Sequence, residues 1–288
     1  MPPGRASQSP LHTPLCDLLG IHHPVLLAPM AGGWTPPELI AAVSSAGGLG
    51  SFGVAGMTTG AVHDAVRRAV ELTTGPVGVN VQVPPDVRRN PDDAGLHALL
   101  APFREELDLP ADPPAPPPAD APAALVEAAL AAGARVVSTA LGDPAEIVEV
   151  ARRAGVPVLA AVTTLDEAQA CVAAGVDAIV AQGAEAGGHR STFSWPSSDP
   201  PPLVGTFALV PLMVDAVDLP VVATGGIMDG RGLAAALALG AQAVQVGTRF
   251  LLAEESAAPA HYREALLELR PEDTVVTDHV SGRPTAAA

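Results

Sequence analysis

A glycine-rich segment with a single histidine, residues 181–190, holds the side chains best suited to chemistry. A hydrophobic run ends at Gln182, and the segment continues through Gly187 and Gly188 to His189. Because glycine has no Cβ, the backbone here can approach a flat ligand closely. An imidazole titrates near neutral pH, so His189 beside that ligand would act as a base, an acid or a hydrogen-bond donor. The segment predicts a ligand-binding loop; a glycine-rich turn with a solvated histidine is the alternative.

The rest of the chain alternates short β-branched runs with alanine-rich stretches, which indicates strands and helices in turn. The runs are almost continuously hydrophobic, as is typical of strands buried on both faces of a parallel sheet. Several alanine-rich stretches end in a glycine just ahead of a run, where a helix would stop. The pattern predicts the α/β class and one (β/α)8 TIM barrel domain over residues 1–288. We place its strands at 24–29, 49–53, 77–81, 135–139, 157–162, 178–183, 221–226 and 243–248.

Polar and glycine residues gather where these strands end. In such a barrel, the carboxyl ends of the strands and the loops after them form the face that carries the active site. Glycines follow the seventh and eighth strands, and their backbone N–H groups would suit a phosphate monoester. This predicts a phosphorylated cofactor or substrate, with two ordinary tight turns as the alternative. The strand-end residues are Ala28, Pro29, Met30, Asn80, Gln182, Gly187, Gly188, His189, Thr224, Gly225, Gly226, Gln245, Val246, Gly247 and Thr248.

Composition restricts the partners and the chemistry. The net charge of −16 argues against nucleic acid or an anionic membrane and favours a small-molecule substrate. All 15 basic residues are arginine, so mechanisms that need a lysine amine are excluded. The chain has no long apolar run and no signal peptide, which predicts a cytoplasmic protein. The two cysteines predict inert thiols, and no histidine or carboxylate spacing predicts a metal site.

Two stretches break the alternation. Residues 110–122 are so rich in proline that we expect a stiff surface connection before a helix at 123–132, with a docking segment as the alternative. Residues 191–202 contain Trp195 and several prolines, and they predict a lid over a pocket; an ordered surface loop is the alternative.

On these motifs the chain resembles the nitronate monooxygenase family, once called 2-nitropropane dioxygenases, which are FMN-dependent barrels. The resemblance extends from residues 23–33 (HPVLLAPMAGG) to 282–284 (GRP), and its most specific part is 182–189 (QGAEAGGH). It departs from the family pattern where Ser191 and the two residues after it follow the histidine and arginine. The chain also stops soon after 282–284, where relatives usually carry more sequence. The other similar segments are 77–80, 162–168, 225–231 and 245–250.

The resemblance implies an FMN cofactor and a place around it for the strand-end residues other than Thr224 and His189. Ala28, Pro29 and Met30 would back the isoalloxazine ring. Asn80 and Gln182 would hydrogen-bond its polar edge or the ribityl chain. The tail and phosphate of FMN would be held by the residues of the glycine turns, which are Gly187, Gly188, Gly225, Gly226, Gln245, Val246, Gly247 and Thr248.

The resemblance also makes His189 the catalytic residue, with an alkyl nitronate and O2 as substrates and a carbonyl compound and nitrite as products. For a neutral nitroalkane, His189 would remove the α-proton; for a nitronate, it would position or neutralise the anion. Two alternatives stay open. One is an NADH-dependent flavin reductase of the enoyl-acyl-carrier-protein reductase or quinone reductase type, and the other is a flavin-binding barrel without turnover. A homodimer is a further open alternative.

Overall fold

The computed structural model describes residues 11–83, 93–111, 120–194, 200–279 and 283–287. The chain divides into two compact units, residues 1–85 with 120–288, and residues 86–119. The first unit contains a parallel sheet of eight strands in the order β1-β9-β8-β6-β5-β4-β3-β2. These strands are β1 (Val25–Leu27), β2 (Gly50–Gly53), β3 (Val77–Gln82), β4 (Val136–Ala140), β5 (Val158–Val162), β6 (Ala178–Gln182), β8 (Val221–Thr224) and β9 (Ala243–Val246).

The sheet closes on itself between β1 and β2. A parallel bridge joins Leu26 to Leu49. The Leu49 N–H donates to the Val25 carbonyl at 3.1 Å, and the Leu27 N–H donates to the Leu49 carbonyl at 2.9 Å. The predicted (β/α)8 barrel is therefore confirmed, and every strand lies within two residues of its predicted bounds.

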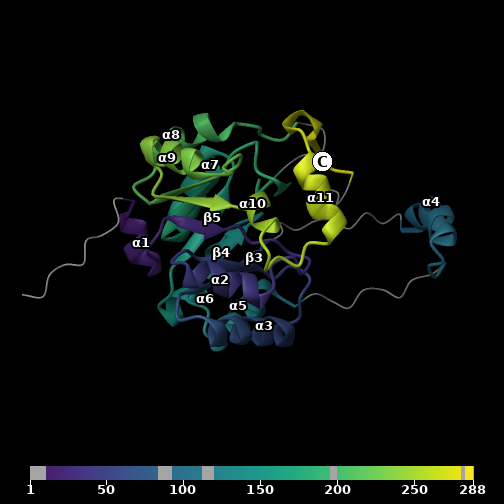
Figure 1. Ribbon diagram of the computed structural model, residues 1–288, viewed down its shortest axis with the longest axis horizontal. Helices are drawn as coiled ribbons and strands as arrows, with labels where there is room; N and C mark the ends of the chain where they lie inside the picture. Colours follow the sequence, from purple (N-terminus) through teal and green to yellow (C-terminus); the bar gives the residue numbers. More distant parts are fainter. Residues whose placement is uncertain (1–10, 84–92, 112–119, 195–199, 280–282, 288) are drawn as a thin grey trace, which may run out of the picture. The chain divides into compact units, whose positions relative to one another are not determined.

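Helices surround this barrel in the first unit (Figure 1). The predicted glycine stops are confirmed, because Gly155 and Gly175 end their helices in the left-handed region with φ of 67° and 87°. The surrounding elements are α2 (Pro37–Ser45), α3 (Thr59–Leu72), α5 (Pro122–Ala131), α6 (Ala145–Ala154), α7 (Leu165–Ala174), α8 (Thr206–Ala216), α9 (Gly230–Ala238), α10 (Thr248–Leu251), α11 (Ala260–Glu268) and the short 3-10 helix η1 (Pro271–Asp273).

Alternate side chains of the strands point into the barrel or out toward the helices. Leu26 and Val222 belong to a buried cluster inside the barrel. Their chain neighbours Leu27 and Val221 belong to a larger cluster that the outer helices cover. This alternation explains why the runs are hydrophobic throughout, and it identifies which strand-end residues face inward.

A short helix, α1 (Pro14–Leu19), closes the amino end of the barrel. Leu15 is fully buried in the inner cluster. The Thr13 hydroxyl donates to the Gln242 carbonyl at 2.7 Å, and the Leu15 N–H donates to the Gln242 side-chain oxygen at 3.0 Å. Because Gln242 directly precedes β9, α1 lies at the amino ends of the strands. Figure 1 shows α1 and the C-terminal helix α11 on opposite sides of this unit.

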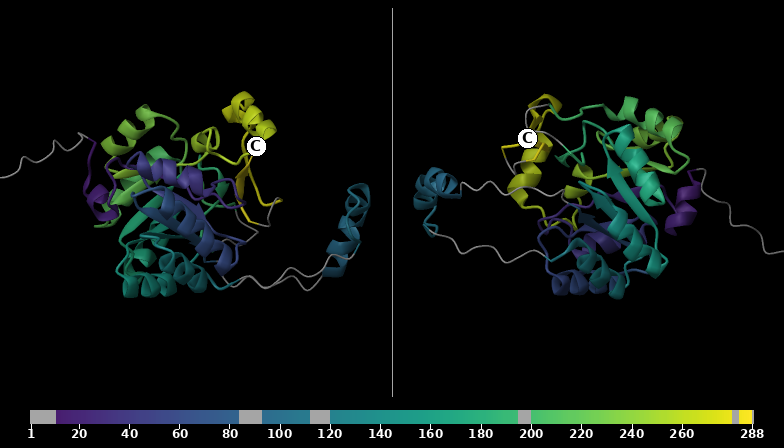
Figure 2. Two further views of the ribbon diagram at one scale, coloured as in Figure 1. Left: turned by 60° about the horizontal axis from the view of Figure 1, so that its bottom comes forward. Right: turned by 180° about the vertical axis from the view of Figure 1, so that it is seen from behind.

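A second, three-stranded antiparallel sheet was not predicted. It has the order β10-β11-β7 and consists of β7 (Gly188–His189), β10 (Val275–Thr277) and β11 (Thr285–Ala287). Strand β11 pairs with β7, so that Thr285 lies opposite His189 and Ala286 opposite Gly188. The end of the chain therefore folds back onto the glycine-rich segment, and Figure 2 shows these C-terminal elements in yellow.

The second unit contains one described helix, α4 (Asp93–Glu106), which has Pro102 inside it. The side chains of Leu99 and Phe103 are exposed on it. This helix was not predicted from the sequence. Among the described residues, no helix is long and apolar enough to cross a membrane. The predicted proline-rich connection falls largely on residues 112–119, which lie outside the described residues.

Candidate functional site

The inward-facing residues at the carboxyl ends of the strands are polar. Gln182 at the end of β6 lies beside Thr224 of β8, which lies beside Gln245 of β9. The Thr224 hydroxyl donates to the Gln245 carbonyl at 2.9 Å. Across the barrel, the Asn80 side-chain amide donates to the Ser138 hydroxyl at 2.9 Å. The barrel interior thus changes from apolar at its amino end to polar at the end where Gln182 begins the glycine-rich segment.

The segment after β1 lies against two glycines. A Cβ on Gly247 would lie 3.4 Å from the Ala28 Cβ and 3.8 Å from the Met30 sulfur. A Cβ on Gly53 would lie 2.8 Å from the Ala31 nitrogen and 2.9 Å from the Met30 carbonyl carbon. The structure therefore brings Ala28 and Met30 next to Gly247, and Met30 next to Gly53.

The glycine turns after β6, β8 and β9 also converge. A Cβ on Gly187 would lie 3.9 Å from the Thr248 hydroxyl oxygen, and a Cβ on Gly225 would lie 2.9 Å from the Ala186 nitrogen. Gly225 and Gly226 both have positive φ, 119° and 68°, which other residues rarely adopt. Close approach and backbone conformation thus require glycine at this junction.

The start of α9, beside that junction, already carries an anion. The Asp229 carboxylate accepts a hydrogen bond from the Arg231 N–H at 2.9 Å and pairs with its guanidinium at 2.6 Å. These hydrogen bonds hold the pKa of Asp229 at about 2. A phosphate at the start of α9 would be repelled by the Asp229 carboxylate. The backbone N–H groups of the glycine turns are therefore better placed to bind a phosphate.

The backbone of His189 is held by its neighbours on the barrel and at the C-terminus. The Gln182 side chain donates to the His189 carbonyl at 2.9 Å and accepts from the Ser191 N–H at 2.8 Å. The Arg190 N–H donates to the Pro284 carbonyl at 2.8 Å. Gln182 thus uses one donor and one acceptor of its amide to fix this loop at the end of the barrel.

Arg190 anchors the same loop from inside the protein. Its side chain is only 1% exposed. The guanidinium donates to the carbonyls of Gly183 at 2.6 Å, Gln182 at 3.1 Å and Pro202 at 3.3 Å. Burial lowers its pKa, and the charges of Glu167 and Glu185 oppose that shift. A charged side chain thus ties the loop to the end of β6.

Glu167 fixes the residues that follow. Its carboxylate accepts from the Thr163 N–H at 2.7 Å and from the Phe193 N–H at 2.9 Å. The hydroxyls of Thr163 and Thr192 lie 2.8 Å apart. No role was predicted for Glu167 from the sequence, although Thr164 and Glu167 have the spacing of a helix capping box, which the structure contains. The predicted lid at 191–202 begins here, but residues 195–199 lie outside the described residues.

The His189 imidazole is half-buried in an electropositive setting. Burial, and then the positive charge of Arg283, lower the pKa of His189 below its ordinary value of 6.5. At neutral pH the ring is therefore uncharged, with one nitrogen free of a proton. A neutral imidazole at the carboxyl end of a barrel can take a proton from a carbon acid.

Replacing Gly183 by alanine is expected to disturb this site, since the new Cβ would lie 1.9 Å from the Thr206 hydroxyl and 2.5 Å from the Thr206 backbone nitrogen. We expect the free energy of unfolding to fall by about 1–3 kcal/mol, measured by urea denaturation. Gly230→Ala is the matched control, because a Cβ there has nothing within 4 Å. Equal stabilities of the two variants would contradict the close contact.

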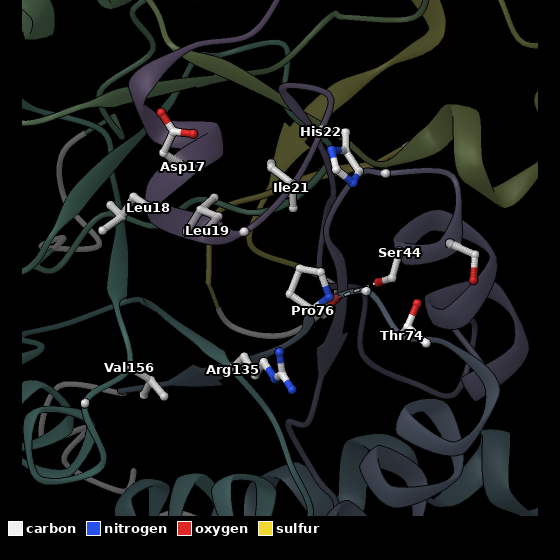
Figure 3. A pocket seen from close by; sticks show the side chains of 15 residues that line it. Asp17, Leu18, Leu19, Ile21, His22, Ser44, Thr74, Pro76, Arg135 and Val156 are labelled. Atoms are coloured by element: carbon white, nitrogen blue, oxygen red, sulfur yellow. Dashed lines mark hydrogen bonds between the residues drawn. The ribbon is translucent and has the colours of Figure 1, made fainter. Parts of the chain in front are cut away.

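A cavity lies at the opposite end of the barrel (Figure 3). Its volume is about 470 Å³, and its lining includes Asp17, His22, Ser44, Pro76 and Arg135. Pro76 and Arg135 directly precede β3 and β4, so this cavity faces the amino ends of the strands. The Ser44 hydroxyl donates to the Pro76 carbonyl at 2.7 Å and accepts from a backbone N–H, which makes it a structural group. The cavity holds none of the strand-end residues.

Both cysteines are buried free thiols, Cys16 beneath the barrel and Cys171 on α7. Burial, with the charges of Glu167 and Asp143, raises the pKa of Cys171 to about 12. This thiol stays protonated at neutral pH, in agreement with the prediction that it is inert.

A protein-family model described as nitronate monooxygenase matches residues 12–288. A probable nitronate monooxygenase of Staphylococcus saprophyticus is 38% identical over 276 residues, which are 95% of this chain and 78% of the relative. One of Staphylococcus aureus strain N315 is 39% identical over 271 residues, 93% of this chain and 76% of the relative.

Two solved structures have the same fold. Nitroalkane oxidase from Streptomyces ansochromogenes has a TM-score of 0.82 and 38% identity, covering 95% of this chain and 78% of its own. FabK from Thermotoga maritima has a TM-score of 0.71 and 34% identity, covering 96% of this chain and 74% of its own.

Proposed function

Because this chain belongs to the nitronate monooxygenase family of oxidoreductases, we propose that it oxidises alkyl nitronates with O2 and FMN, giving a carbonyl compound and nitrite. The resemblance on which the sequence analysis relied is thus confirmed, and the family is one of flavoenzymes. The observation that supports the proposal most is the fixed position of His189, a neutral imidazole beside the converging glycine turns.

The residues at the carboxyl end of the barrel fit a flat, phosphorylated cofactor. A side chain at Gly247 would fill the space beside Ala28 and Met30, and one at Gly187 would approach Thr248. We assign Ala28, Pro29 and Met30 to the ring. Bound FMN supplies an electron acceptor that amino-acid side chains lack. The assigned contacts to the ring edge, ribityl chain and phosphate are Asn80, Gln182, Gly187, Gly188, Gly225, Gly226, Gln245, Val246, Gly247 and Thr248.

His189 would act in one of two ways, depending on the form of the substrate. A neutral nitroalkane carries an acidic α-proton, which the unprotonated imidazole nitrogen of His189 can remove. A nitronate has already lost that proton, so His189 would then orient it by donating a hydrogen bond to a nitro oxygen. The lowered pKa of His189 supports the first role, because the imidazole is then unprotonated and able to act as a base at neutral pH.

The test is oxygen uptake by the FMN-loaded protein given a small alkyl nitronate in the absence of NADH. We expect oxygen consumption together with nitrite release. A parallel assay with the parent nitroalkane measures the proton-removal step as well. Flavin-loaded protein that consumes no oxygen and releases no nitrite with either compound would contradict the proposal and favour a flavin-binding barrel without turnover.

The second candidate function is NADH-dependent flavin reduction of the enoyl-acyl-carrier-protein reductase or quinone reductase type. The observation that favours it is the likeness to FabK from Thermotoga maritima, at 34% identity over 96% of this chain. The nitroalkane oxidase structure has the higher identity and the higher TM-score, 0.82 against 0.71, which ranks nitronate oxidation first.

A further inference from the structure

The C-terminal strand places an arginine next to the catalytic candidate. Thr285 of β11 lies directly opposite His189 of β7, and their side chains share one face of the small sheet. Arg283 lies two positions before Thr285, in the bend that leads into β11, and the Pro284 carbonyl between them accepts the hydrogen bond from the Arg190 N–H. The Thr285 hydroxyl donates to the Arg283 carbonyl at 3.0 Å, which fixes the backbone between them. The Arg283 side chain is therefore within reach of the His189 ring.

Arg283 differs from the arginines that form ion pairs with carboxylates in this acidic chain. Arg152, Arg231 and Arg270 each lie within 2.7 Å of a carboxylate and are well exposed. Arg283 is half-buried, and among the described residues no carboxylate pairs with its guanidinium. Burial without a paired anion lowers its pKa. A half-buried cation in a protein of net charge −16 is available to an anionic ligand.

We propose that Arg283 is a substrate-binding residue, whose guanidinium binds the two nitro oxygens of an anionic nitronate beside His189. A planar guanidinium matches a planar pair of oxygens and can donate two parallel hydrogen bonds to it. The inference deepens the proposed function and rests on it. Because a neutral His189 carries no charge, it cannot balance the negative charge of a nitronate. The guanidinium of Arg283 supplies that positive charge.

The charged residues that follow His189 in the chain and β10 in the small sheet do not take this role. The Arg190 guanidinium points inward to the carbonyls of Gln182 and Gly183. Asp278, which follows β10, lies 3.6 Å from the exposed His279 ring. Within the part of the chain that the structure describes, Arg283 carries the charge that lowers the pKa of His189. Its effect on the histidine provides a second readout, independent of ligand binding.

The binding test uses propionate, which has the shape and charge of the nitronate of nitroethane but cannot react. Its dissociation constant is measured by calorimetry with FMN-loaded wild type, Arg283→Gln and Arg283→Lys. We expect Arg283→Gln to weaken binding by about 10–100-fold, the value of a charge-assisted hydrogen bond, and Arg283→Lys to weaken it less. Neutral propionamide serves as the matched ligand, and its binding is expected to change less than about threefold.

Three results would overturn the inference. The first is that propionate binds Arg283→Gln as tightly as wild type. The second is that Arg283→Gln loses the same factor of affinity for propionate and for propionamide. The third is that propionate does not bind wild type. Arg270→Gln, which removes an exposed arginine paired with Asp273, is the protein control and should bind propionate as wild type does. Because propionate binding needs no turnover, its outcome is separate from that of the oxygen-uptake assay. Failure of nitronate oxidation therefore cannot be mistaken for failure of the arginine assignment.

The pH profile gives the second readout. Removing the Arg283 charge takes away one of the two causes that lower the pKa of His189, so this pKa should rise in Arg283→Gln. The acid limb of kcat/KM for a neutral nitroalkane is then expected to move to higher pH. KM for the anionic nitronate should rise while kcat changes little. An acid limb at the wild-type pH, or a fall in kcat alone, would show that Arg283 does not act beside His189.

Discussion

Replacing His189 by alanine is expected to lower kcat/KM for a neutral nitroalkane by about 10²–10⁴-fold, the usual contribution of a general base. The imidazole is half-buried, and the hydrogen bond from Gln182 to its backbone carbonyl fixes its position. Of the described residues assigned to this site, His189 is the one with an imidazole side chain. Steady-state oxygen uptake with the flavin content of each variant measured separately tests the expectation.

The loss is expected to depend on the substrate and on pH. A preformed nitronate needs no proton removed, so its kcat/KM should fall less than that of the nitroalkane. In the wild type, nitroalkane activity should be constant above pH 6.5 and fall below it, because protonation through the lowered pKa of His189 removes the base. His261→Ala, an exposed histidine on α11, is the matched control. Equal activity of the two variants would contradict the role of His189.

Replacing Arg190 by methionine is expected to lower the free energy of unfolding by about 3 kcal/mol or more. The substitution keeps an apolar stem but leaves the carbonyls of Gln182, Gly183 and Pro202 without their donor. Each buried polar group that loses its partner costs about 1–3 kcal/mol. Urea denaturation of the flavin-loaded protein measures the change.

The control for this substitution is Arg152→Met. Arg152 is paired with Glu149 at 2.7 Å, but both side chains are about 60% exposed. Exposed ion pairs contribute about 0–1 kcal/mol, so this variant should be nearly as stable as wild type. If the two arginine variants lose equal stability, then Arg190 does not hold the loop as its hydrogen bonds indicate.

The barrel was predictable because its signals are local. A strand buried on both faces must be apolar at nearly every position, and this makes β6 and β8 visible as continuous hydrophobic runs. A helix that ends in the left-handed region favours glycine, so Gly155 and Gly175 marked helix ends without knowledge of the fold. Both signals lie within a few residues of the element that they identify.

The small sheet beside His189 was not predictable in the same way. Strand β7 has two residues, too few for any periodicity, and it pairs with β11 at the far end of the chain. The sequence therefore predicted His189 as a catalytic candidate, but it did not predict the strand that holds this residue or the neighbouring Arg283. Helix α4 was missed for a different reason, since Pro102 and a proline-rich surrounding argue against a helix locally.

Arg190 shows where residue type misleads. Arginine is seldom fully buried, so its side chain was not expected in the core. Its role comes from tertiary structure, because the carbonyls at the end of β6 and Pro202 surround a space that only a long donor can fill. The roles of Glu167 and Gln182 in holding the loop likewise depend on contacts across the barrel end. Of these contacts, only the capping box of Thr164 and Glu167 has a spacing that can be recognised in the local sequence.

The most direct test of nitronate oxidation at this site is to mix the FMN-loaded protein anaerobically with an alkyl nitronate or with NADH. The flavin absorbance is then recorded over time. The proposed function predicts that the nitronate bleaches the flavin rapidly and that NADH bleaches it far more slowly. Rapid bleaching by NADH, with a flavin that stays oxidised in the presence of the nitronate, would contradict it and establish the reductase alternative.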